Sequence, residues 1–462
     1  MRRLAPIIAV ALVAATASVG VASALDTPPP TPVPVPCQQV DHHHRGGKAK
    51  ASPSPSPEAT SQPGVCVSPS PFPTVLHTPA PSKGPPRTAP AIRARAAILE
   101  DLDTGQVLFA RHANDERPLA STTKIMTALV VLSRAHPGEV ITVGPDAAEE
   151  GSAGAGFSEL GLASGEHITV QNLLYAMMLQ SSNDASVALA EGLSGTTERF
   201  VAAMNRMAHA LGLHHSKFFS PSGLDDRGHS SARELAAITR RAFRDALFAR
   251  IVRTEFFSIP APSGPPRRVQ NRNVLLWLYP GSLGGKTGYT SAAGFCLVAA
   301  AEREGRRLLS VVLGDATGDD TFDDSAALLN FGFRGFRPVT LARRGQALPP
   351  VPVGTDSLTV RADADLSSLV PVGKAPKVKR AVRVRPGLEL PLRAGTKVGV
   401  VAFLLGGRRL GRVAMVVPVS ARVAPRPGAG ARSAAPSGSP WWERGAGAVV
   451  TFGMRAFWSL FG

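Results

Sequence analysis

L-A-S-T-T-K-I-M-T-A-L, residues 119–129, is the stretch from which we interpret the rest of the chain. Ser121 and Lys124 are three residues apart at the expected start of a helix, so both side chains share one face, with apolar residues behind them. A lysine amine can take the proton of a serine hydroxyl only if burial or nearby positive charge lowers its pKa from about 10.4. A helix N-terminus supplies such a field, and its N–H groups suit an oxyanion. The pair is a candidate nucleophile and base.

One S-x-x-K match is weak evidence, because a capping serine and a solvated lysine give the same pattern. Two later stretches strengthen it. Ser181-Ser182-Asn183 follows an apolar helical pattern, and Lys286-Thr287-Gly288 opens a strand pattern. Penicillin-recognising serine enzymes carry S-x-x-K, S-D-N and K-T-G together. All three have a counterpart here in the same order, the second as S-S-N, so chance is a poor explanation.

The composition is that of a folded protein with a strong positive charge. The 462 residues leave room for two or more domains, and an apolar fraction of 44% is enough for a sizeable core. The formal net charge of +17 favours contact with anionic surfaces such as membrane lipid or cell-wall polymer. We discount nucleic acid as a partner because the basic residues look dispersed and because the N-terminus directs the chain out of the cytoplasm.

Residues 1–24 have the pattern of a secretory signal peptide. Met1-Arg2-Arg3 precedes an apolar run over residues 4–19 and the small residues Ala22-Ser23-Ala24, which predicts cleavage after Ala24. An uncleaved N-terminal anchor is the alternative, because the apolar run is long for a signal peptide. Both interpretations place the body of the protein outside the cytoplasm.

Residues 25–92 are rich in Pro, Ser and Thr and are expected to form a disordered spacer. Cys37 and Cys66 lie in it and are near enough in sequence to form a disulfide. Cys296 lies in an apolar strand pattern and is expected to be a buried small side chain. The run at residues 41–44, Asp-His-His-His, has poor ligand geometry in such a spacer, so we predict no metal and no cofactor.

Residues 93–336 are expected to form an α+β domain, in which the first hairpin joins the same sheet as the later strands. Thr169 is expected to cap the helix that ends at residues 181–183. The Gly- and Ser-rich residues 150–158 suit an exposed loop over a site. The predicted hairpin strands are 96–100 and 106–110; the later helices are 184–193, 198–211 ended by Gly212, and 232–248 opened by the capping box Ser231-x-x-Glu234; the later strands are 285–292, 294–303 and 307–314; and the closing helix is 322–331, stopped by Gly332.

The remaining residues suggest a second module and an anchor. Residues 337–423 read as a small all-β domain with a turn at Gly406-Gly407, and residues 424–440 read as a linker. Residues 441–462 form an amphipathic pattern with a narrow polar stripe, which favours a helix lying in the membrane surface. A membrane span or a partner-binding helix would also fit this pattern.

Four stretches of residues 93–336 together resemble a known family, the serine-type D-Ala-D-Ala carboxypeptidases, or low-molecular-mass penicillin-binding proteins. They are P-L-A-S-T-T-K-I-M-T-A-L, Q-S-S-N-D-A, F-x-S-P-S-G-L-D-D and G-G-K-T-G-Y-T. The resemblance implies a β-lactamase/penicillin-binding-protein-like domain, with an antiparallel sheet flanked by helices, followed by the small β domain. It also implies removal of the terminal D-alanine from peptidoglycan stem peptides ending in D-Ala-D-Ala, inhibition by β-lactams, and attachment to the outer face of the cell membrane.

The resemblance also implies roles for residues of the first two motifs. Ser121 would be the nucleophile, acylated by the carbonyl of the penultimate D-alanine, and Lys124 would take its proton. Ser181 and Asn183 would relay protons and orient the peptide. Ser182, where the motif has aspartate, is interpreted as a tolerated change.

The third motif would bind the substrate. By the same resemblance, Lys286 would set the electrostatics of the site and Thr287 would hydrogen-bond the terminal carboxylate. The backbone N–H groups of Ser121 and Tyr289 would form the oxyanion hole. Gly288, lacking a side chain, would let the strand edge approach the substrate.

The chain departs from the family pattern in one place. Many relatives carry an arginine for the carboxylate shortly before the last helix, whereas residues 318–324 read G-D-D-T-F-D-D. Carboxylate binding therefore rests on Thr287 and Lys286, or the substrate preference differs.

Three different functions would also fit parts of this sequence. A class A-like β-lactamase shares the three motifs but needs a deacylating glutamate. Glu198 lies between the second and third motifs, without an E-x-x-L-N-like stretch. An endopeptidase acting on crosslinks would use the same motifs, and a non-catalytic cell-wall-binding scaffold would keep the fold without the reaction.

Overall fold

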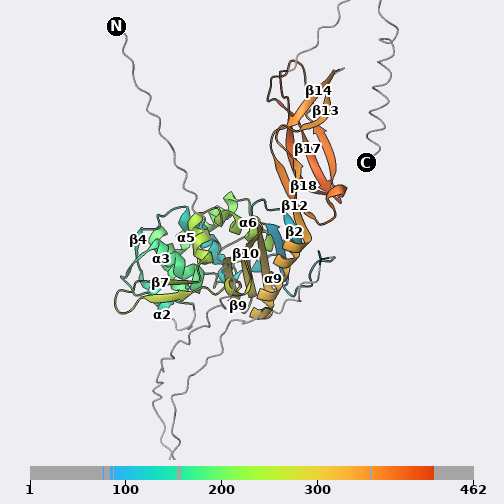
Figure 1. The fold of residues 1–462 in the computed structure, drawn as a ribbon. Coiled ribbons are helices and arrows are strands. Elements are labelled where there is room, and N and C mark those ends of the chain that lie inside the picture. The colour runs from blue at the N-terminus through green and yellow to red at the C-terminus, as the bar shows by residue number, and fades with distance from the viewer. Residues whose placement is uncertain (1–75, 77–83, 87, 153–157, 354–355, 421–462) are drawn as a thin grey trace, which may run out of the picture. The chain divides into compact units, whose positions relative to one another are not determined.

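The structure, a computed structural model, describes residues 76, 84–86, 88–152, 158–353 and 356–420 (Figure 1). The predicted signal peptide, the cysteines and histidines of the spacer, the linker at 424–440 and the amphipathic tail lie outside these residues. Within the described residues, no helix has both the length and the apolar character needed to cross a membrane.

A five-stranded antiparallel sheet forms the centre of the first domain, in the strand order β2-β1-β11-β10-β9. Its first two strands form the predicted hairpin and pair with the last strand of the meander, with Ala96 opposite Leu313. Both expectations are therefore confirmed. The strands are β1 (Ala96–Asp101), β2 (Val107–Arg111), β9 (Ser282–Thr290), β10 (Gly294–Arg303) and β11 (Arg306–Asp315).

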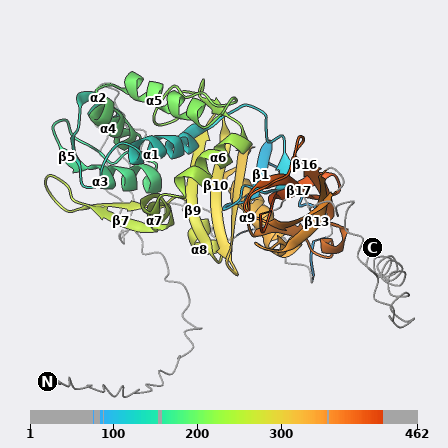
Figure 2. The same cartoon turned by 90° about the horizontal axis from the view of Figure 1, so that it is seen from above.

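Both faces of this sheet are buried. Consecutive side chains of a strand point to opposite faces, so neighbouring residues of β1 show what covers each face. Ile98 packs in one apolar cluster with helices of residues 124–253, and its neighbour Leu99 packs in a second cluster with α9 (Gly318–Gly335). Figure 2 shows strands β9 and β10 between α9 on one side and the larger group of helices on the other. This arrangement confirms the α+β class.

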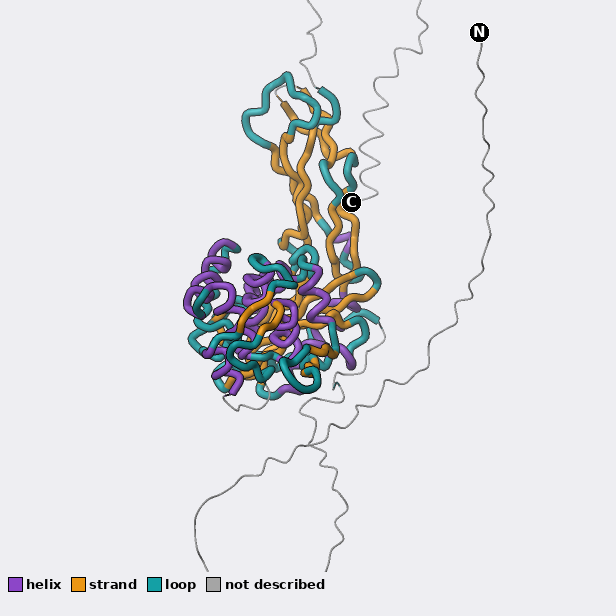
Figure 3. The backbone as a smooth tube through the Cα atoms, turned by 90° about the vertical axis from the view of Figure 1, so that its left-hand side faces the viewer, coloured by secondary structure: helices purple, strands orange, loops and turns teal. Residues whose placement is uncertain are grey.

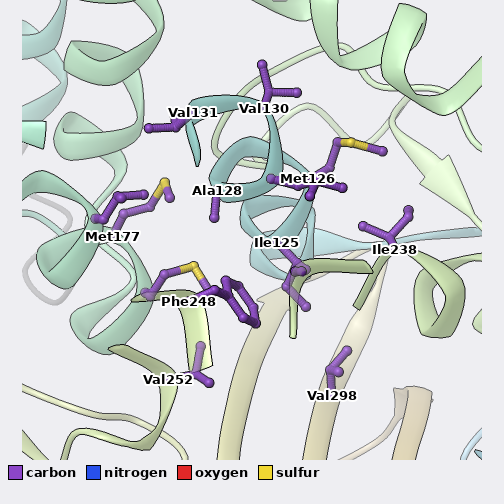
Figure 4. Close-up of a cluster of buried hydrophobic side chains, with 14 of the residues drawn as sticks. Ile125, Met126, Ala128, Val130, Val131, Met177, Ile238, Phe248, Val252 and Val298 are labelled. Atoms are coloured by element: carbon purple, nitrogen blue, oxygen red, sulfur yellow. The ribbon is translucent and has the colours of Figure 1, made fainter. Parts of the chain in front are cut away.

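Helix α1 (Lys124–Leu132) is almost entirely buried within the first cluster. Figure 4 shows its residues Ile125, Met126 and Ala128 among side chains that include Met177 and Phe248. A short 3-10 turn, η1 (Ala120–Thr123), precedes α1 and contains Ser121. The predicted helix thus begins as a tight turn, and its burial fixes the turn that carries Ser121.

The predicted helices of the large group occur in the predicted order, and α2 is an additional helix that was not predicted. Thr169 caps α3 by accepting a hydrogen bond from the Asn172 N–H, as expected. The helices of this group are α2 (Pro145–Ser152), α3 (Val170–Tyr175), the π-helical turn η2 (Ala176–Gln180), α4 (Asn183–Ser194), α5 (Thr197–Ala210), α6 (Ala232–Ala242) and α7 (Ala246–Arg253). The short helix α8 (Leu275–Leu278) packs in the second cluster with α9.

Three helix predictions need correction. The segment predicted as one helix over residues 232–248 is two helices, because Asp245 caps α7 with its carboxylate, which accepts the Leu247 and Phe248 N–H groups. Ser231 does cap α6, but the Glu234 carboxylate accepts N–H groups of His214 and His215 instead of closing a capping box. Residues 150–152, predicted as loop, belong to α2, and residues 153–157 lie outside the described residues.

The closing helix is also longer than predicted, because α9 begins after its cap Thr317 and continues to Gly335. Gly332 lies inside the helix and does not end it. A Cβ at Gly332 would lie 2.5 Å from Cδ1 of Leu308, so glycine is needed there for close packing of α9 on the sheet.

Three two-stranded pairs at the edges of the domain escaped the sequence-based prediction. They are too short for a period-2 pattern to show. The pairs are β3 (Arg117–Pro118) with β6 (His229–Ser230), β4 (Val140–Thr142) with β5 (His167–Thr169), and β7 (Phe256–Ile259) with β8 (Arg267–Gln270).

The residues after α9 form the predicted small β module, in which strands and loops predominate (Figure 3). The turn at Gly406-Gly407 joins β17 to β18, as expected. The strands are β12 (Phe336–Ala342), β13 (Ala347–Val353), β14 (Asp356–Ala362), β15 (Leu366–Pro371), β16 (Lys379–Val384), β17 (Lys397–Leu405) and β18 (Arg408–Val416), with a 3-10 turn η3 (Ala375–Lys377).

The positive charge is concentrated in this β module. Residues 337–420 contain 15 Lys and Arg but only four Asp and Glu, a net charge of +11 out of +17 for the whole chain. The interpretation of the basic residues as dispersed is therefore wrong at the scale of the domains.

Candidate active site

Ser121 and Lys124 meet at the start of α1 as their spacing predicts. Lys124 Nζ lies 3.0 Å from Ser121 Oγ, within hydrogen-bond distance. The 3-10 turn places Ser121 one turn before the helix, and Lys124 is the first residue of α1. The hydroxyl and amine are therefore in direct contact before any substrate binds.

Burial lowers the affinity of the Lys124 amine for a proton. The side chain is fully buried, and this desolvation, together with the positive charge of Arg272, lowers the pKa of Lys124 to about 7. A substantial share of the amine is therefore neutral near neutral pH. Neutral amine has a free lone pair that can accept the Ser121 proton.

Two further contacts hold this amine in place. Lys124 Nζ donates to Asn183 Oδ1 at 2.7 Å and to the carbonyl of Ser222 at 2.8 Å. Asn183 is the last residue of the second motif and the first residue of α4. The structure thus joins the first two motifs directly, across 59 positions of sequence.

The second motif lies where a π-helical turn meets α4. Ser181 is buried and has a left-handed backbone, with φ of 71°, which ends η2 before α4 begins. The buried Ser182 hydroxyl has no hydrogen-bond partner among the described residues. Within the same residues, the Ser181 hydroxyl is not hydrogen-bonded to another member of the three motifs, so this motif contacts Lys124 through Asn183.

The third motif packs against the Ser121 turn through Gly288. A Cβ at Gly288 would lie 3.0 Å from the backbone nitrogens of Ser121 and Thr122. The absent side chain therefore lets strand β9 approach the 3-10 turn. Tyr289, next in the strand, is 55% exposed and packs on the Phe295 ring at 4.4 Å between centroids.

Lys286 is the second buried lysine of the site. Its Nζ donates to the carbonyl of Thr287 at 2.9 Å. Burial, with the neighbouring charges of Lys124 and Arg272, holds the pKa of Lys286 well below its ordinary value. The positive charge of Arg272 thus lowers the pKa of both buried lysines. Thr287 is half-buried on the same strand, and its side chain makes no hydrogen bond to the other motifs within the described residues.

Arg272 is a site residue that sequence reasoning missed. Its guanidinium donates to Ser158 Oγ at 3.1 Å, and its N–H donates to the Leu179 carbonyl just before the second motif. Burial lowers its pKa to about 10. Asn271 fixes this segment by donating to the Val252 and Thr254 carbonyls. The run N-R-N over residues 271–273 is the only sequence signal of this arrangement.

Asp184 is the other residue whose importance sequence alone did not show. Its buried carboxylate accepts the backbone N–H groups of Leu160, Gly161 and Leu162. These bonds fix the segment from Ser158 to Leu162, and the Ser158 carbonyl accepts the Asn183 N–H at 2.6 Å. Asp184 thus positions one wall of the site.

Residues 318–324, which contain no arginine for the carboxylate, form the first turns of α9. Here Asp324 accepts the N–H groups of Arg93 and Ala94, and Asp320 pairs with the Arg93 side chain at 3.1 Å. This stretch therefore holds the segment that leads into β1. Glu198 lies exposed in the first turn of α5, where its carboxylate bonds to the capping Thr196, so it serves as a helix-start residue.

Cys296 is free and fully buried, and burial raises the pKa of its thiol to about 12, as fits a packing residue. The described part of the chain brings together no group of three His, Cys, Asp or Glu side chains that could hold a metal ion.

An antiparallel sheet between helices, with a buried Ser-x-x-Lys pair at a helix start and a Lys-Thr-Gly strand beside it, defines the class of penicillin-recognising serine enzymes. Comparison with known families makes this specific. Residues 84–317 match the family described as D-alanyl-D-alanine carboxypeptidase, and residues 336–421 match the C-terminal domain of penicillin-binding protein 5. The chain belongs to the D-alanyl-D-alanine carboxypeptidase family of serine peptidases.

Individual relatives agree with this family. D-alanyl-D-alanine carboxypeptidase DacF of Bacillus subtilis is 31% identical over 72% of this chain and 86% of its own length. DacC of Escherichia coli is 34% identical over 71% of this chain and 84% of its own length. The crystal structure of penicillin-binding protein 5 from Haemophilus influenzae matches with a TM-score of 0.63 at 31% identity, over 72% of this chain and 98% of that one. The predicted fold and enzyme class are confirmed.

Proposed function

We propose that this protein removes the terminal D-alanine of peptidoglycan stem peptides through an acyl-enzyme on Ser121. The observation that carries the proposal is the 3.0 Å contact between Ser121 Oγ and the buried amine of Lys124. The neutral amine takes the hydroxyl proton while Oγ attacks the carbonyl of the penultimate D-alanine. The peptide bond then breaks, the leaving D-alanine amine receives a proton, and water hydrolyses the acyl-enzyme.

The developing oxyanion is assigned to the backbone N–H groups of Ser121 and Tyr289. The close approach of Gly288 to the Ser121 nitrogen supports this assignment, because it brings the two chain segments that carry these donors together. Removing a donor of this kind typically costs about 3 kcal/mol of transition-state stabilisation.

The substrate carboxylate is assigned to Thr287, with positive charge from Lys286 and Arg272. Support comes from the electrostatic influence of Arg272 on both buried lysines. Arg272 would thus supply charge that many relatives draw from an arginine near the last helix. Asn183 would position Lys124 and the peptide, and Ser181 would relay the proton to the leaving amine.

Changing Ser121 to Ala tests the proposal. The intact mass of the wild-type chain should increase by one penicillin molecule, and a peptide ending in D-Ala-D-Ala should release D-alanine. Ser121→Ala should lose both, because no hydroxyl remains to be acylated. The neighbouring Thr122→Ser is the matched control and should keep both. A penicillin adduct on Ser121→Ala would contradict the assignment, and penicillin turnover without D-alanine release would indicate a β-lactamase.

The proposed cellular context is the outer face of the cell membrane. Residues 1–24 would export the chain, residues 93–336 would be the catalytic domain, residues 337–423 the β module, and the amphipathic residues 441–462 the membrane anchor. Stem peptides would be the substrates and β-lactams the inhibitors.

Deleting residues 441–462 tests the anchor. The apolar face of the predicted helix would be lost, so membrane-bound protein should become soluble after cell fractionation. D-alanine release from a soluble peptide should remain within about twofold of wild type, because the site lies in residues 121–289. Unchanged membrane binding at both low and high salt would contradict this anchor.

A further inference from the structure

Strands β16, β17 and β18 of the β module form a sheet segment with charge of one sign. They contain seven Lys and Arg and no Asp or Glu. Strand β16 is exposed along nearly its whole length. Such uniform charge repels itself and is a cost to the folded state unless a partner compensates it.

The strand register places four of the basic residues on one side. Lys379 lies opposite Leu404, which lies opposite Arg409, and Arg383 lies opposite Val400. Arg412 lies opposite Ala402. Residues directly opposite one another point to the same face of a sheet.

This side faces away from the core of the module. Val401 and Phe403, which alternate with Ala402 along β17, are buried in the apolar cluster. Ala402 and its cross-strand neighbours therefore point outward. We name this surface the basic face: the exposed Lys379, Arg383, Arg409 and Arg412 around the half-buried Val400, Ala402 and Leu404. None of the four basic side chains has an ion-pair partner among the described residues.

Protection of a sheet edge is the simplest competing explanation. Lysine and arginine on an edge strand prevent pairing with other chains. That explains Lys379 and Arg383, because β16 is the edge of the order β13-β14-β18-β17-β16. Strand β18 pairs with β14 only at Met415 and Val416, so Arg409 and Arg412 also lie on a stretch with one neighbour. Edge protection does not require that these charges share one face of the sheet with Lys379 and Arg383, as the register places them.

We propose that the basic face binds the phosphate headgroups of anionic phospholipids. Each basic side chain near an anionic membrane raises binding roughly fivefold, so four act together strongly. The proposal rests on the proposed membrane attachment, since only 20 residues separate Ser420 from Trp441. Whatever their conformation, they span at most roughly 75 Å, which keeps the face near a membrane that holds the tail. A tail and a face on one chain reinforce each other's binding.

The test measures binding of the full chain to vesicles of phosphatidylglycerol and phosphatidylcholine in equal parts, and to phosphatidylcholine alone. Lys379, Arg383, Arg409 and Arg412 are changed together to Gln. Binding to the anionic vesicles should fall by about six-hundredfold at low salt, and this difference should shrink as salt screens the charges. Release of D-alanine from a soluble peptide should be unchanged in this variant.

Two matched controls isolate the position of the charge. Arg134, Arg206, Arg241 and Arg244, exposed in the other domain, are changed together to Gln and should leave vesicle binding within about threefold of wild type. Arg383→Lys, Arg409→Lys and Arg412→Lys together keep the charge and should also keep binding. The proposal would be overturned if the Gln variant of the face and the Gln variant of the other domain lost vesicle binding equally, because both remove four positive charges.

Deleting residues 441–462 separates this proposal from that of the anchor. A tail-deleted chain that still binds anionic but not neutral vesicles, and loses this binding in the Gln variant of the face, supports the basic face whether or not the tail is an anchor. A tail-deleted chain without any preference for anionic vesicles overturns it. The proposal is also overturned if the Gln variant of the face loses binding to a purified phosphodiester wall polymer but binds vesicles as the wild type does. The ligand of the basic face would then be the polymer.

Discussion

Lys124 can act as a base because the fold removes its amine from water. Full burial and the nearby Arg272 lower its pKa to about 7. Only the neutral amine accepts a proton, so the acylation rate by penicillin should rise about tenfold per pH unit below pH 7 and level off above it. Stopped-flow acylation across pH 5 to 9 measures this profile. A rate independent of pH in this range would mean that another group is the base.

A conservative variant separates the base from the mere positive charge. Lys124→Arg keeps a cation at the site, but a guanidinium stays protonated across this range. This variant should therefore show no measurable acylation at any pH, and a circular dichroism spectrum checks that it folds.

The residues that sequence reasoning found and those that it missed differ in kind. Ser121, Lys124 and Asn183 belong to motifs whose side-chain types suit the proposed chemistry, and two of them are one helical turn apart. The carbonyl of Ser222 also holds Lys124, but a backbone group has no signature in the sequence. Arg272 reaches the site only through the tertiary fold, by its contacts with Ser158 and Leu179.

At the scale of elements, the contact between β9 and the 3-10 turn η1 determines the geometry of the site. Gly288→Ala would place a Cβ 3.0 Å from the Ser121 nitrogen, so the strand and turn must separate by a few tenths of an ångström. This shift displaces the proposed oxyanion hole, and displacements of about 1 Å cost on the order of a hundredfold in rate. We expect at least a tenfold fall in the acylation rate, measured by intact mass over time.

A second glycine provides the control for that variant. Gly138 has nothing within 4 Å of a Cβ built on it. Gly138→Ala should therefore acylate at the wild-type rate. A similar rate for Gly288→Ala would show that the contact with η1 does not position the site.

Helix boundaries were the least predictable elements, and the physical reason is competition between local and tertiary signals. Gly332 has the local signal of a helix end, yet α9 continues past it. Glycine is present there because close packing against Leu308 leaves no room for a Cβ. Asp245 sits within a helical apolar pattern and still starts α7, because its carboxylate satisfies two backbone N–H groups. Strands β9, β10 and β11 were predictable because long apolar runs with clear turns determine them.

At the scale of the whole molecule, the sequence predicted two domains, but not how the chain passes between them. Helix α9 ends at Gly335, and β12 begins at the next residue, Phe336. The last carbonyls of a helix need partners outside it. Arg306, the first residue of β11, donates to the carbonyls of Phe333 and Phe336. Arg337 donates to the same two carbonyls.

This double coverage predicts strong coupling between the two arginines. Either Arg306→Met or Arg337→Met alone leaves both carbonyls with one donor, so each should lower the free energy of unfolding by about 1 kcal/mol. The double variant leaves both carbonyls without a side-chain donor at the domain junction. It should lose about 1–2 kcal/mol more than the sum of the single variants, a coupling that chemical denaturation of all four proteins measures. Additive losses would mean that water replaces these donors, and that the junction depends on apolar packing around Phe333 and Phe336 instead.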